Sequence, residues 1–264
     1  DSYLPIIRQA GGIPRLVRLE PPHWRITEEA LRKVFNHKTK AIVFNNPLNP
    51  AAVVYPREDL ELLARFCQEF DAVAICDEVW EHVTFDGLPH IPLISIPGMR
   101  ERAIKIGSAG KMFSLTGWKV GWIEGPAHLM GAIANAHQFL TFTTAPALQL
   151  GVAHGLDHEM DFTLGMTRAL QRKRDLLSAA LREIGMDLLP CQGTYFVTGS
   201  IRNLSNEPDS QFCTRLTREA GVAAIPLSAF YGADPPTDLV RFAFCKKDDV
   251  LEEAATRLRR YFSA

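Results

Sequence analysis

The sequence predicts an α/β fold, in which helices pack against a mostly parallel sheet. Three short apolar runs support this prediction, because each stops abruptly at polar residues. The runs are residues 41–44 before Asn45, 73–76 before Asp77, and 103–106 before Gly107 and Ser108. The first two are continuously apolar, as expected for strands buried on both faces of a parallel sheet. The polar residues that follow should lie along one sheet edge, where open α/β folds bind ligands.

The segment between the first two runs is predicted to be a helix. Pro56 stands near its start and acidic residues occupy its early turns, both typical of a helix N-terminus. Its apolar residues repeat at helical spacing: Leu60, Leu63, Ala64 and Cys67. A strand, a helix and a strand in this order predict a right-handed parallel crossover.

The remaining elements are predicted from caps and periodicity. Thr27 is expected to cap a helix running to about Asn36, and residues 16–19 and 120–123 are expected to be strands. Helices are expected over 127–140 and 163–184, the second ending at Gly185. The tail alternates strand, helix, strand and helix over 195–198, 209–220, 239–244 and a last segment that Asp248 caps.

The change of pattern near residue 160 predicts two domains. Residues 1–160 would form a larger sheet-based domain, and residues 161–264 a smaller domain of mixed helices and strands. The apolar stripe of the last helix is interpreted as core rather than as a partner surface.

Composition excludes several function classes. The chain has 264 residues, with 29 lysines and arginines against 30 aspartates and glutamates and a formal net charge of -1. No basic stripe is available for nucleic acid or an anionic membrane, and no apolar run approaches the ~20 residues of a membrane span. Its 5 cysteines include no C-x-x-C pair, which disfavours disulfides and zinc and favours the cytoplasm.

Four short motifs could carry chemistry. They are the asparagine and proline run 46–50, Asp77-Glu78-Val79-Trp80, Ser108-Ala109-Gly110-Lys111, and Trp118-Lys119 followed far away by Arg241-Phe242-Ala243-Phe244. Each alone has a structural explanation, such as a turn, a helix cap or a surface charge. Their order on consecutive strand ends is more informative, because it would gather an amide, a carboxylate and an amine around one cavity.

Taken together, these motifs resemble the class I and II aminotransferases, which use pyridoxal 5′-phosphate. The phrases N-P-x-N-P, D-E-V, S-x-G-K, T-G-W-K-V-G and R-F-A-F occur in the family's order. The surrounding phrases, residues 1–5, 10–12, 85–87 and 193–196, are most similar to the branch containing kynurenine, methionine and aspartate-type aminotransferases. The resemblance implies a three-layer α/β/α cofactor domain, here without its N-terminal third, a smaller C-terminal α+β domain, and a homodimer.

The resemblance also implies a role for each matching residue. Lys111 matches the lysine that holds the cofactor as a Schiff base and moves a proton between the substrate Cα and the cofactor. Asp77 matches the acid that pairs with the pyridinium nitrogen. Asn49 matches the residue that contacts the cofactor's phenolic oxygen and the substrate carboxylate. Ser108 and Lys119 match phosphate-binding residues, and Arg241 matches the clamp on the substrate α-carboxylate.

Two departures from the family pattern stand near these positions. Trp80 replaces the usual tyrosine. The indole is expected to be a cofactor neighbour whose N–H donor reaches a different distance from that of a phenol; the alternative is that it only packs. Ala51 and Ala52 replace the usual threonine and glycine after Asn49, which should change the loop more than the chemistry.

The function expected from the resemblance is ping-pong transfer of an amino group from an L-amino acid to a 2-oxo acid. Sulfur-containing or aromatic amino acids are mildly preferred as substrates. Two alternatives stay open: a carbon–sulfur β-lyase on the same scaffold, and a non-catalytic remnant of the fold. Because the family's N-terminal third is not found before Asp1, the 264-residue chain is expected to bind the cofactor weakly or not at all.

Other apparent motifs are weaker. Residues 107–111 resemble a phosphate loop, but Lys105 and Met112 stand where the Walker pattern needs a glycine and a hydroxyl residue. His154 and His158 have helical ligand spacing, yet Gly155 weakens the helix and H-E-x-x-H is absent. No metal is therefore expected.

Overall fold

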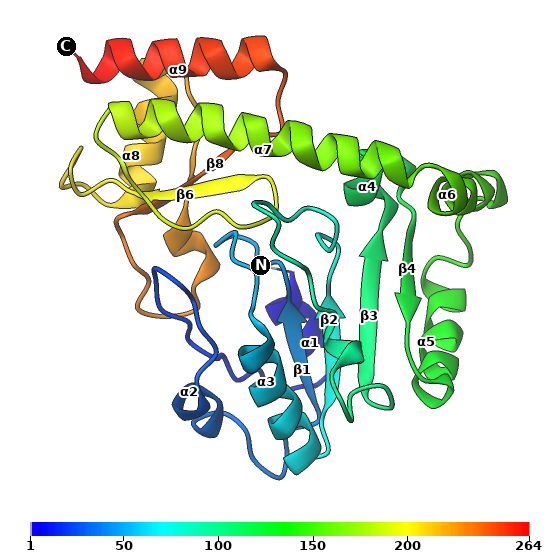
Figure 1. The fold of residues 1–264 in the computed structure, drawn as a ribbon. Coiled ribbons are helices and arrows are strands. Elements are labelled where there is room, and N and C mark those ends of the chain that lie inside the picture. Colours follow the sequence, from blue (N-terminus) through cyan, green and yellow to red (C-terminus); the bar gives the residue numbers. More distant parts are fainter. Residues whose placement is uncertain (1, 264) are drawn as a thin grey trace.

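The computed structural model describes residues 2–263 and confirms the α/β class. Its first sheet has the order β1-β2-β3-β4 (Figure 1). The strands are β1 (Ala41–Asn45), β2 (Val73–Asp77), β3 (Ala103–Ser108) and β4 (Gly121–Glu124). The first three are parallel, and β4 is antiparallel to β3. All four coincide with strands expected from the sequence.

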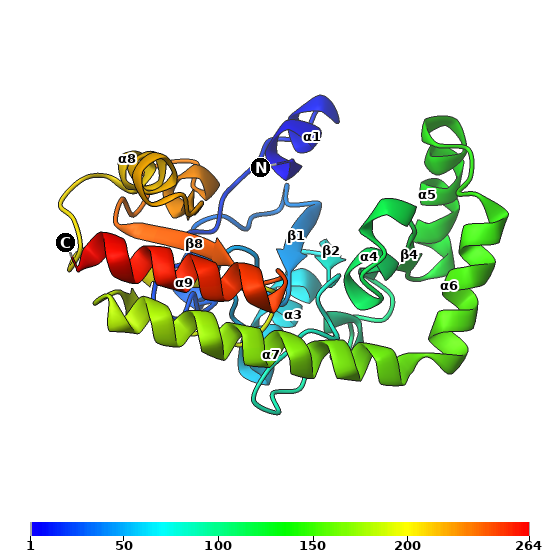
Figure 2. The same ribbon diagram turned by 90° about the horizontal axis from the view of Figure 1, so that it is seen from above.

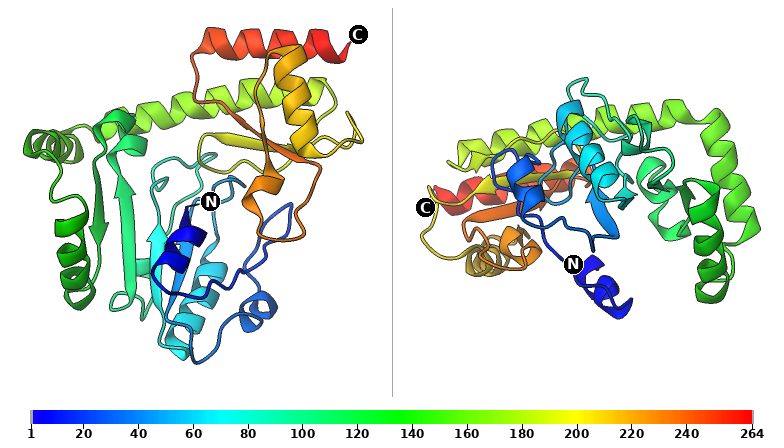
Figure 3. Two further views of the ribbon diagram at one scale, coloured as in Figure 1. Left: turned by 180° about the vertical axis from the view of Figure 1, so that it is seen from behind. Right: turned by 90° about the horizontal axis from the view of Figure 1, so that it is seen from below.

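Helix α3 (Arg57–Glu69) makes the crossover from β1 to β2. Pro56 precedes it in an extended conformation, and Glu58 and Asp59 lie in its first turn, where acids favour the helix dipole. Its apolar face packs with inward residues of β1 and β2 in one buried cluster. Helix α1 (Tyr3–Gln9) lies on the opposite side of the sheet, as the view from behind shows (Figure 3).

Burial of the first sheet is less complete than the continuous apolar runs predict. In β2 buried residues alternate with half-buried ones, and in β1 only Phe44 is fully buried. The reason is that β1 is an edge strand and that, within residues 2–263, α3 and the segment after it cover one face more fully than the other.

The second sheet is antiparallel, in the order β5-β6-β8-β7. Its strands are β5 (Asp187–Leu188), β6 (Phe196–Ser200), β7 (Ile225–Pro226) and β8 (Leu239–Ala243). Helices α7 (Met160–Glu183) and α9 (Asp248–Phe262) run side by side across it, and α8 (Asp209–Arg215) continues as a π-helical turn, Leu216–Ala220 (Figures 1 and 2). The stripe of α9 is core, as predicted: Leu251, Ala255 and Leu258 are buried.

The remaining helices are short or lie beside β4. They are α2 (Glu28–Arg32), α4 (Ala109–Met112), α5 (Ala127–Leu140) and α6 (Pro146–His158), with 3-10 turns at Leu93–Ser95, Thr116–Trp118 and Leu227–Phe230. Exposed apolar side chains gather on α5, α6 and the start of α7: Phe139, Leu140, Leu150, Leu156, Phe162 and Leu164. No helix among the described residues is long and apolar enough to cross a membrane.

Three local predictions need correction. Residues 16–19 form no strand, because they lie in an extended segment held by side chains, with Arg18 donating to the Asp234 carbonyl. Helix α2 has the predicted Thr27 cap but ends at Arg32. Asp248 does not cap α9; it is the first helical residue, and Lys247 is the cap position without a side-chain bond.

Helix α6 is not among the elements expected from the sequence, although Pro146 at its start is a good N-terminal signal. Gly155 does not break it, because the glycine is buried against the ring of Phe113, where an added Cβ would come within 3.2 Å. His154 and His158 do share one face of α6, with ring centroids 4.7 Å apart.

Candidate active site

The parallel register brings the polar strand ends together. Asn45 at the end of β1 is level with Asp77 at the end of β2, and Asp77 is level with Ile106 in β3. Lys111 follows within a few residues of β3, in α4. The amide, carboxylate and amine predicted to share one sheet edge therefore do so.

Lys111 lies among aromatic rings. Its Nζ is 3.4 Å from the Tyr195 hydroxyl and 5.0 Å from the ring centre of Trp80. Trp80 and Tyr195 pack edge to face, with centroids 4.3 Å apart, and Trp80 is only 3% exposed. Within residues 2–263 no carboxylate forms an ion pair with Lys111, so the amine has no structural partner of opposite charge.

Backbone hydrogen bonds place Tyr195 beside Lys111. The Gln192 and Gly193 N–H groups donate to the Ala52 carbonyl at 2.7 and 3.0 Å, and the Thr194 N–H donates to the Val83 carbonyl at 2.9 Å. Gly193 is required there, because an added Cβ would lie 2.8 Å from the Val83 oxygen. The segment before β6 is thus fastened to the loops that follow β1 and β2.

Arg241 and Asn49 meet at the other end of this cluster. Arg241 projects from the middle of β8, and its Nη1 donates to Asn49 Oδ1 at 2.6 Å. The guanidinium carbon lies 3.9 Å from the Phe196 ring centre and 5.0 Å from that of Phe230. Burial lowers the pKa of Arg241 from its ordinary value, but a guanidinium remains charged at every physiological pH.

Asn45, the last residue of β1, links two residues of the predicted site. Its Nδ2 donates to the Asp77 carbonyl at 2.8 Å, and its Oδ1 accepts from the Asn49 N–H at 2.8 Å. One side chain thereby fixes the backbone of both Asp77 and Asn49.

The Asp77 carboxylate has one occupied and one free oxygen. The Tyr3 hydroxyl of α1 donates to Oδ2, whereas Oδ1 is buried without a hydrogen-bond partner among the described residues. Burial and the adjacent Asp77 raise the pKa of Tyr3, so this phenol is protonated at neutral pH. A buried, unpartnered carboxylate oxygen is costly unless another donor satisfies it.

The neighbouring Glu78 is used differently. Its Oε1 accepts from the Leu93 N–H at 2.9 Å, and its Oε2 lies 2.9 Å from His90 Nε2. Both of its oxygens are satisfied inside the core, which makes Glu78 a structural carboxylate, whereas Asp77 keeps an oxygen without a partner among the described residues.

The two residues predicted to bind the cofactor phosphate make fewer contacts with the rest of the site. Ser108 ends β3 and is half-buried directly before α4, close in sequence to Lys111. Lys119 is exposed and has a left-handed backbone with φ of 56°. No hydrogen bond or ion pair of the Lys119 side chain is found within residues 2–263, so the structure does not bring it into contact with the other candidates.

Three residues at this site had no predicted role: Tyr3, Asn45 and Tyr195. Tyr195 lies in the phrase Gly193-Thr194-Tyr195-Phe196 that contributed to the resemblance, and Asn45 directly precedes the N-P-x-N-P phrase. Their places in and beside these phrases are the sequence signals that could have identified them as site residues. Their contacts with Lys111, Asp77 and Asn49 depend on the tertiary fold.

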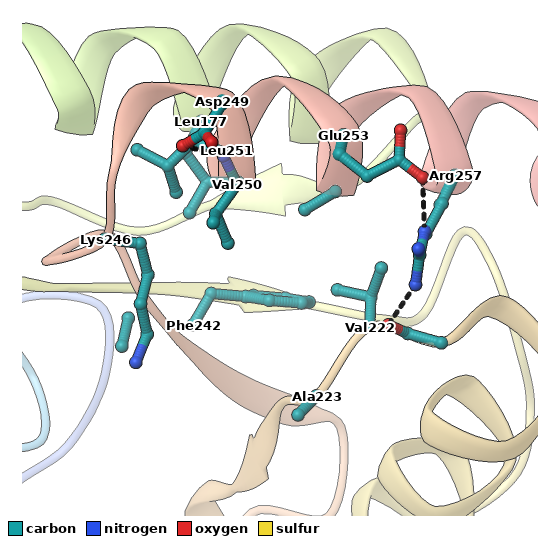
Figure 4. Close-up of a pocket in the computed structure, with 13 residues that line it drawn as sticks. Leu177, Val222, Ala223, Phe242, Lys246, Asp249, Val250, Leu251, Glu253 and Arg257 are labelled. Carbon is teal, nitrogen blue, oxygen red and sulfur yellow. Dashed lines mark hydrogen bonds and ion pairs between the residues drawn. The ribbon is translucent and has the colours of Figure 1, made fainter.

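A separate cavity of about 480 Å³ lies between α9, β8 and the turn after the π-helical segment (Figure 4). Phe242 and Val222 give it apolar walls, and Lys246 lies at one end. Arg257 at the opposite end is bound to Glu253 and to the Gly221 carbonyl. None of the predicted site residues lines this cavity.

Comparison with known proteins agrees with the motif order. The family model for aminotransferase class I and II matches residues 1–258. The chain is 40% identical to methionine aminotransferase of Escherichia coli strain K12, over 98% of this chain and 67% of the relative. It is 38% identical to a kynurenine–oxoglutarate transaminase of Dictyostelium discoideum, covering 98% of this chain and 68% of that protein.

Solved structures show the same relationship. A methionine aminotransferase structure from Escherichia coli superposes with a TM-score of 0.95 at 38% identity, covering 98% of this chain and 68% of that one. N-succinyldiaminopimelate aminotransferase from Mycobacterium tuberculosis has a TM-score of 0.91 at 39% identity, covering 97% and 68%. The chain thus spans about two thirds of the length of these relatives. It belongs to the class I and II aminotransferase family, and its function is the transfer of amino groups.

Proposed function

We propose that this chain transfers an amino group from an L-amino acid to a 2-oxo acid, with pyridoxal 5′-phosphate attached to Lys111. The observation that carries the proposal is the placement of Asp77 at the end of β2 and of Lys111 just beyond the end of the adjacent β3, with Arg241 and Asn49 held in the same group of contacts. When bound, pyridoxal phosphate supplies an electron sink that stabilises the negative charge left on the substrate Cα.

The residues present fit this cofactor. Its ring nitrogen needs an acceptor, and Asp77 Oδ1 is buried without a partner among the described residues. Its aldehyde needs an amine, and within residues 2–263 the Lys111 amine forms no ion pair that would have to be broken first. Two residues are proposed to bind its phosphate. Ser108, directly before α4, would donate its hydroxyl, and Lys119 would supply a positive point charge.

Lys111 is proposed to move the proton. Once freed by the incoming amino acid, its amine would take the proton from the substrate Cα. The Tyr195 hydroxyl, 3.4 Å from Nζ, would keep that amine pointed into the site. Trp80 is proposed as a cofactor neighbour that walls this space and excludes water, since its ring lies 5.0 Å from Nζ.

Arg241 is proposed to bind the substrate α-carboxylate. A guanidinium matches the two carboxylate oxygens with two parallel N–H donors. Asn49 accepts from Nη1 and the Phe196 ring supports the guanidinium plane, so the fork is oriented before substrate arrives. This contact recognises a group common to all amino acids and leaves side-chain preference to other residues.

Three wider features are also proposed. Residues 1–160 and 161–264 would be the larger and smaller domains, a division supported by the two separate sheets. The family likeness and the exposed apolar side chains of α5 and α6 support a homodimer. The absence of a disulfide among the described cysteines is compatible with the cytoplasm, which we propose as the location.

Absorbance titration with pyridoxal phosphate, followed by an amino-transfer assay, tests the proposal. We expect weak but saturable binding with the absorbance of a lysine-bound cofactor, and amino transfer from methionine or kynurenine to 2-oxoglutarate. Pyruvate release from a cysteine conjugate, measured in parallel, reports the carbon–sulfur lyase reaction. Lyase turnover without amino transfer would contradict the proposal, as would an absorbance change that Lys111→Ala retains.

A further inference from the structure

We propose that Tyr3 is a positioning residue for cofactor binding: its phenol holds one oxygen of Asp77 so that the other is presented to the ring nitrogen of pyridoxal phosphate. The inference rests on the proposed function, because it assigns Asp77 to that nitrogen. It adds a residue from α1, on the face of the sheet opposite α3 (Figure 3).

The geometry divides the two carboxylate oxygens between two tasks. Tyr3 donates to Oδ2, and Oδ1 stays buried without a partner among the described residues. A carboxylate on a single Cβ–Cγ bond can otherwise rotate and exchange its oxygens. The hydrogen bond from Tyr3 therefore selects which oxygen is free and fixes the plane in which its lone pairs lie.

The backbone of Asp77 is held independently. Its carbonyl accepts from Asn45 Nδ2 at 2.8 Å and from the Asn46 N–H at 3.1 Å. The side-chain torsions are therefore the freedom that remains at Asp77, and Tyr3 restricts them. A ligand meeting a pre-positioned carboxylate loses less ordering free energy than one that must orient it.

The direction of the hydrogen bond is also defined. Burial and Asp77 raise the pKa of Tyr3, so the phenol keeps its proton and donates it. The Asp77 carboxylate therefore accepts from the phenol on Oδ2 and keeps Oδ1 to accept from a protonated ring nitrogen. Since the two donors would bind different oxygens, the phenol and the ring nitrogen need not compete.

A comparison of two ligands separates positioning from mere support of the fold. Pyridoxal phosphate and its carbon analogue, in which a C–H group replaces the ring nitrogen, are titrated against the full chain and against Tyr3→Phe. We expect Tyr3→Phe to weaken binding of pyridoxal phosphate about tenfold, as for loss of a hydrogen bond to a charged group. Binding of the carbon analogue should not change, because that ligand has no donor for Asp77.

Tyr261→Phe is the matched control. It removes a phenol of α9 that donates to Glu219 in the π-helical turn, and both ligands should bind this variant as they bind the wild-type chain. Circular dichroism of each variant checks the fold. Equal weakening of both ligands by Tyr3→Phe would overturn the inference in favour of a structural role, and unchanged or tighter binding of pyridoxal phosphate would overturn it because Tyr3 would then be neutral or a competitor.

An Asp77→Ala variant distinguishes failure of this inference from failure of the proposed function. If the wild-type chain prefers pyridoxal phosphate over the carbon analogue and Asp77→Ala removes that preference, Asp77 is the partner of the nitrogen and only the role of Tyr3 is at issue. If the wild-type chain shows no preference, or binds neither ligand, the assignment of Asp77 fails and the inference fails with it.

Discussion

Two cations of the site, Arg241 and Lys119, are held very differently. Arg241 lies in the middle of β8, is 8% exposed, and is supported by Asn49 and two aromatic rings. Lys119 follows a 3-10 turn, is exposed, and has no side-chain partner within residues 2–263. The end of the site proposed for the substrate carboxylate is thus pre-organised, whereas the end proposed for the cofactor phosphate is open.

This contrast has a physical origin in the chain. A strand residue with neighbours on both sides inherits the rigidity of its sheet, and Arg241 is paired with Thr198 on one side and Ile225 on the other. A residue in a connecting turn has no such ladder and depends on its ligand for order. Replacing Arg241 should therefore cost more binding free energy for the substrate than replacing Lys119 costs for the cofactor.

Replacement of Arg241 should give the largest effect on substrate recognition. Arg241→Ala removes a bidentate, charge-assisted contact, so kcat/KM for amino acids should fall by about 100-fold or more. Arg241→Lys keeps the positive charge but not the fork, and should recover only part of that loss. Steady-state kinetics on both variants measure this; full recovery with lysine would show that the oriented fork is unimportant.

Asn49→Ala removes the oxygen that orients Arg241. A hydrogen bond to a charged group is lost, and kcat/KM should fall about tenfold, mainly through a higher KM. Asn36→Ala is a control, because Asn36 accepts from the Lys38 N–H in an exposed turn before β1. If Asn49→Ala leaves KM unchanged, the orientation of Arg241 does not depend on this contact.

Asn45→Ala tests whether Asn45, at the end of β1, holds Asp77 and Asn49 in place. It removes two hydrogen bonds, to the Asp77 carbonyl and from the Asn49 N–H. The free energy of unfolding should fall by about 1–2 kcal/mol, and cofactor affinity several-fold. Urea unfolding monitored by circular dichroism gives the first quantity and absorbance titration the second. A loss of stability with no change in affinity would limit Asn45 to a structural role.

Lys119→Ala should give the smallest effect. An exposed point charge contributes ~1 kcal/mol or less and is screened by salt, so cofactor affinity should fall only a few-fold and the difference should shrink at high ionic strength. Titrations at two salt concentrations measure it. A loss of cofactor affinity as large as about 100-fold would contradict this expectation, because Lys119 would then have to become firmly ordered on the bound phosphate.

Much of the fold follows from local sequence patterns. The β-branched runs that end at Asn45, Asp77 and Ser108 predict three strands and the edge at which their polar ends meet, and β1 to β3 confirm them. Residues 16–19 are also mostly apolar, but they pair with no strand within residues 2–263. Strand formation depends on that partner, which a local pattern does not reveal.

The site divides in the same way. Lys111, Asp77 and Asn49 belong to short phrases whose order is recognisable in the sequence. Tyr3 reaches Asp77 across 74 positions, and Tyr195 reaches Lys111 across 84. Such contacts arise from the packing of α1 and of the segment before β6, and no spacing rule connects residues so far apart in the chain.

Borohydride reduction followed by peptide mass spectrometry tests whether Lys111 is the residue that holds the cofactor. The chain is incubated with pyridoxal phosphate and reduced, which converts a transient lysine linkage into a stable one even when binding is weak. We expect the phosphopyridoxyl group on Lys111 at low cofactor concentration, and in the Lys111→Ala variant we expect no compensating label on Lys105 or Lys119. Labelling spread over surface lysines, with Lys111 no more modified than the rest, would contradict it.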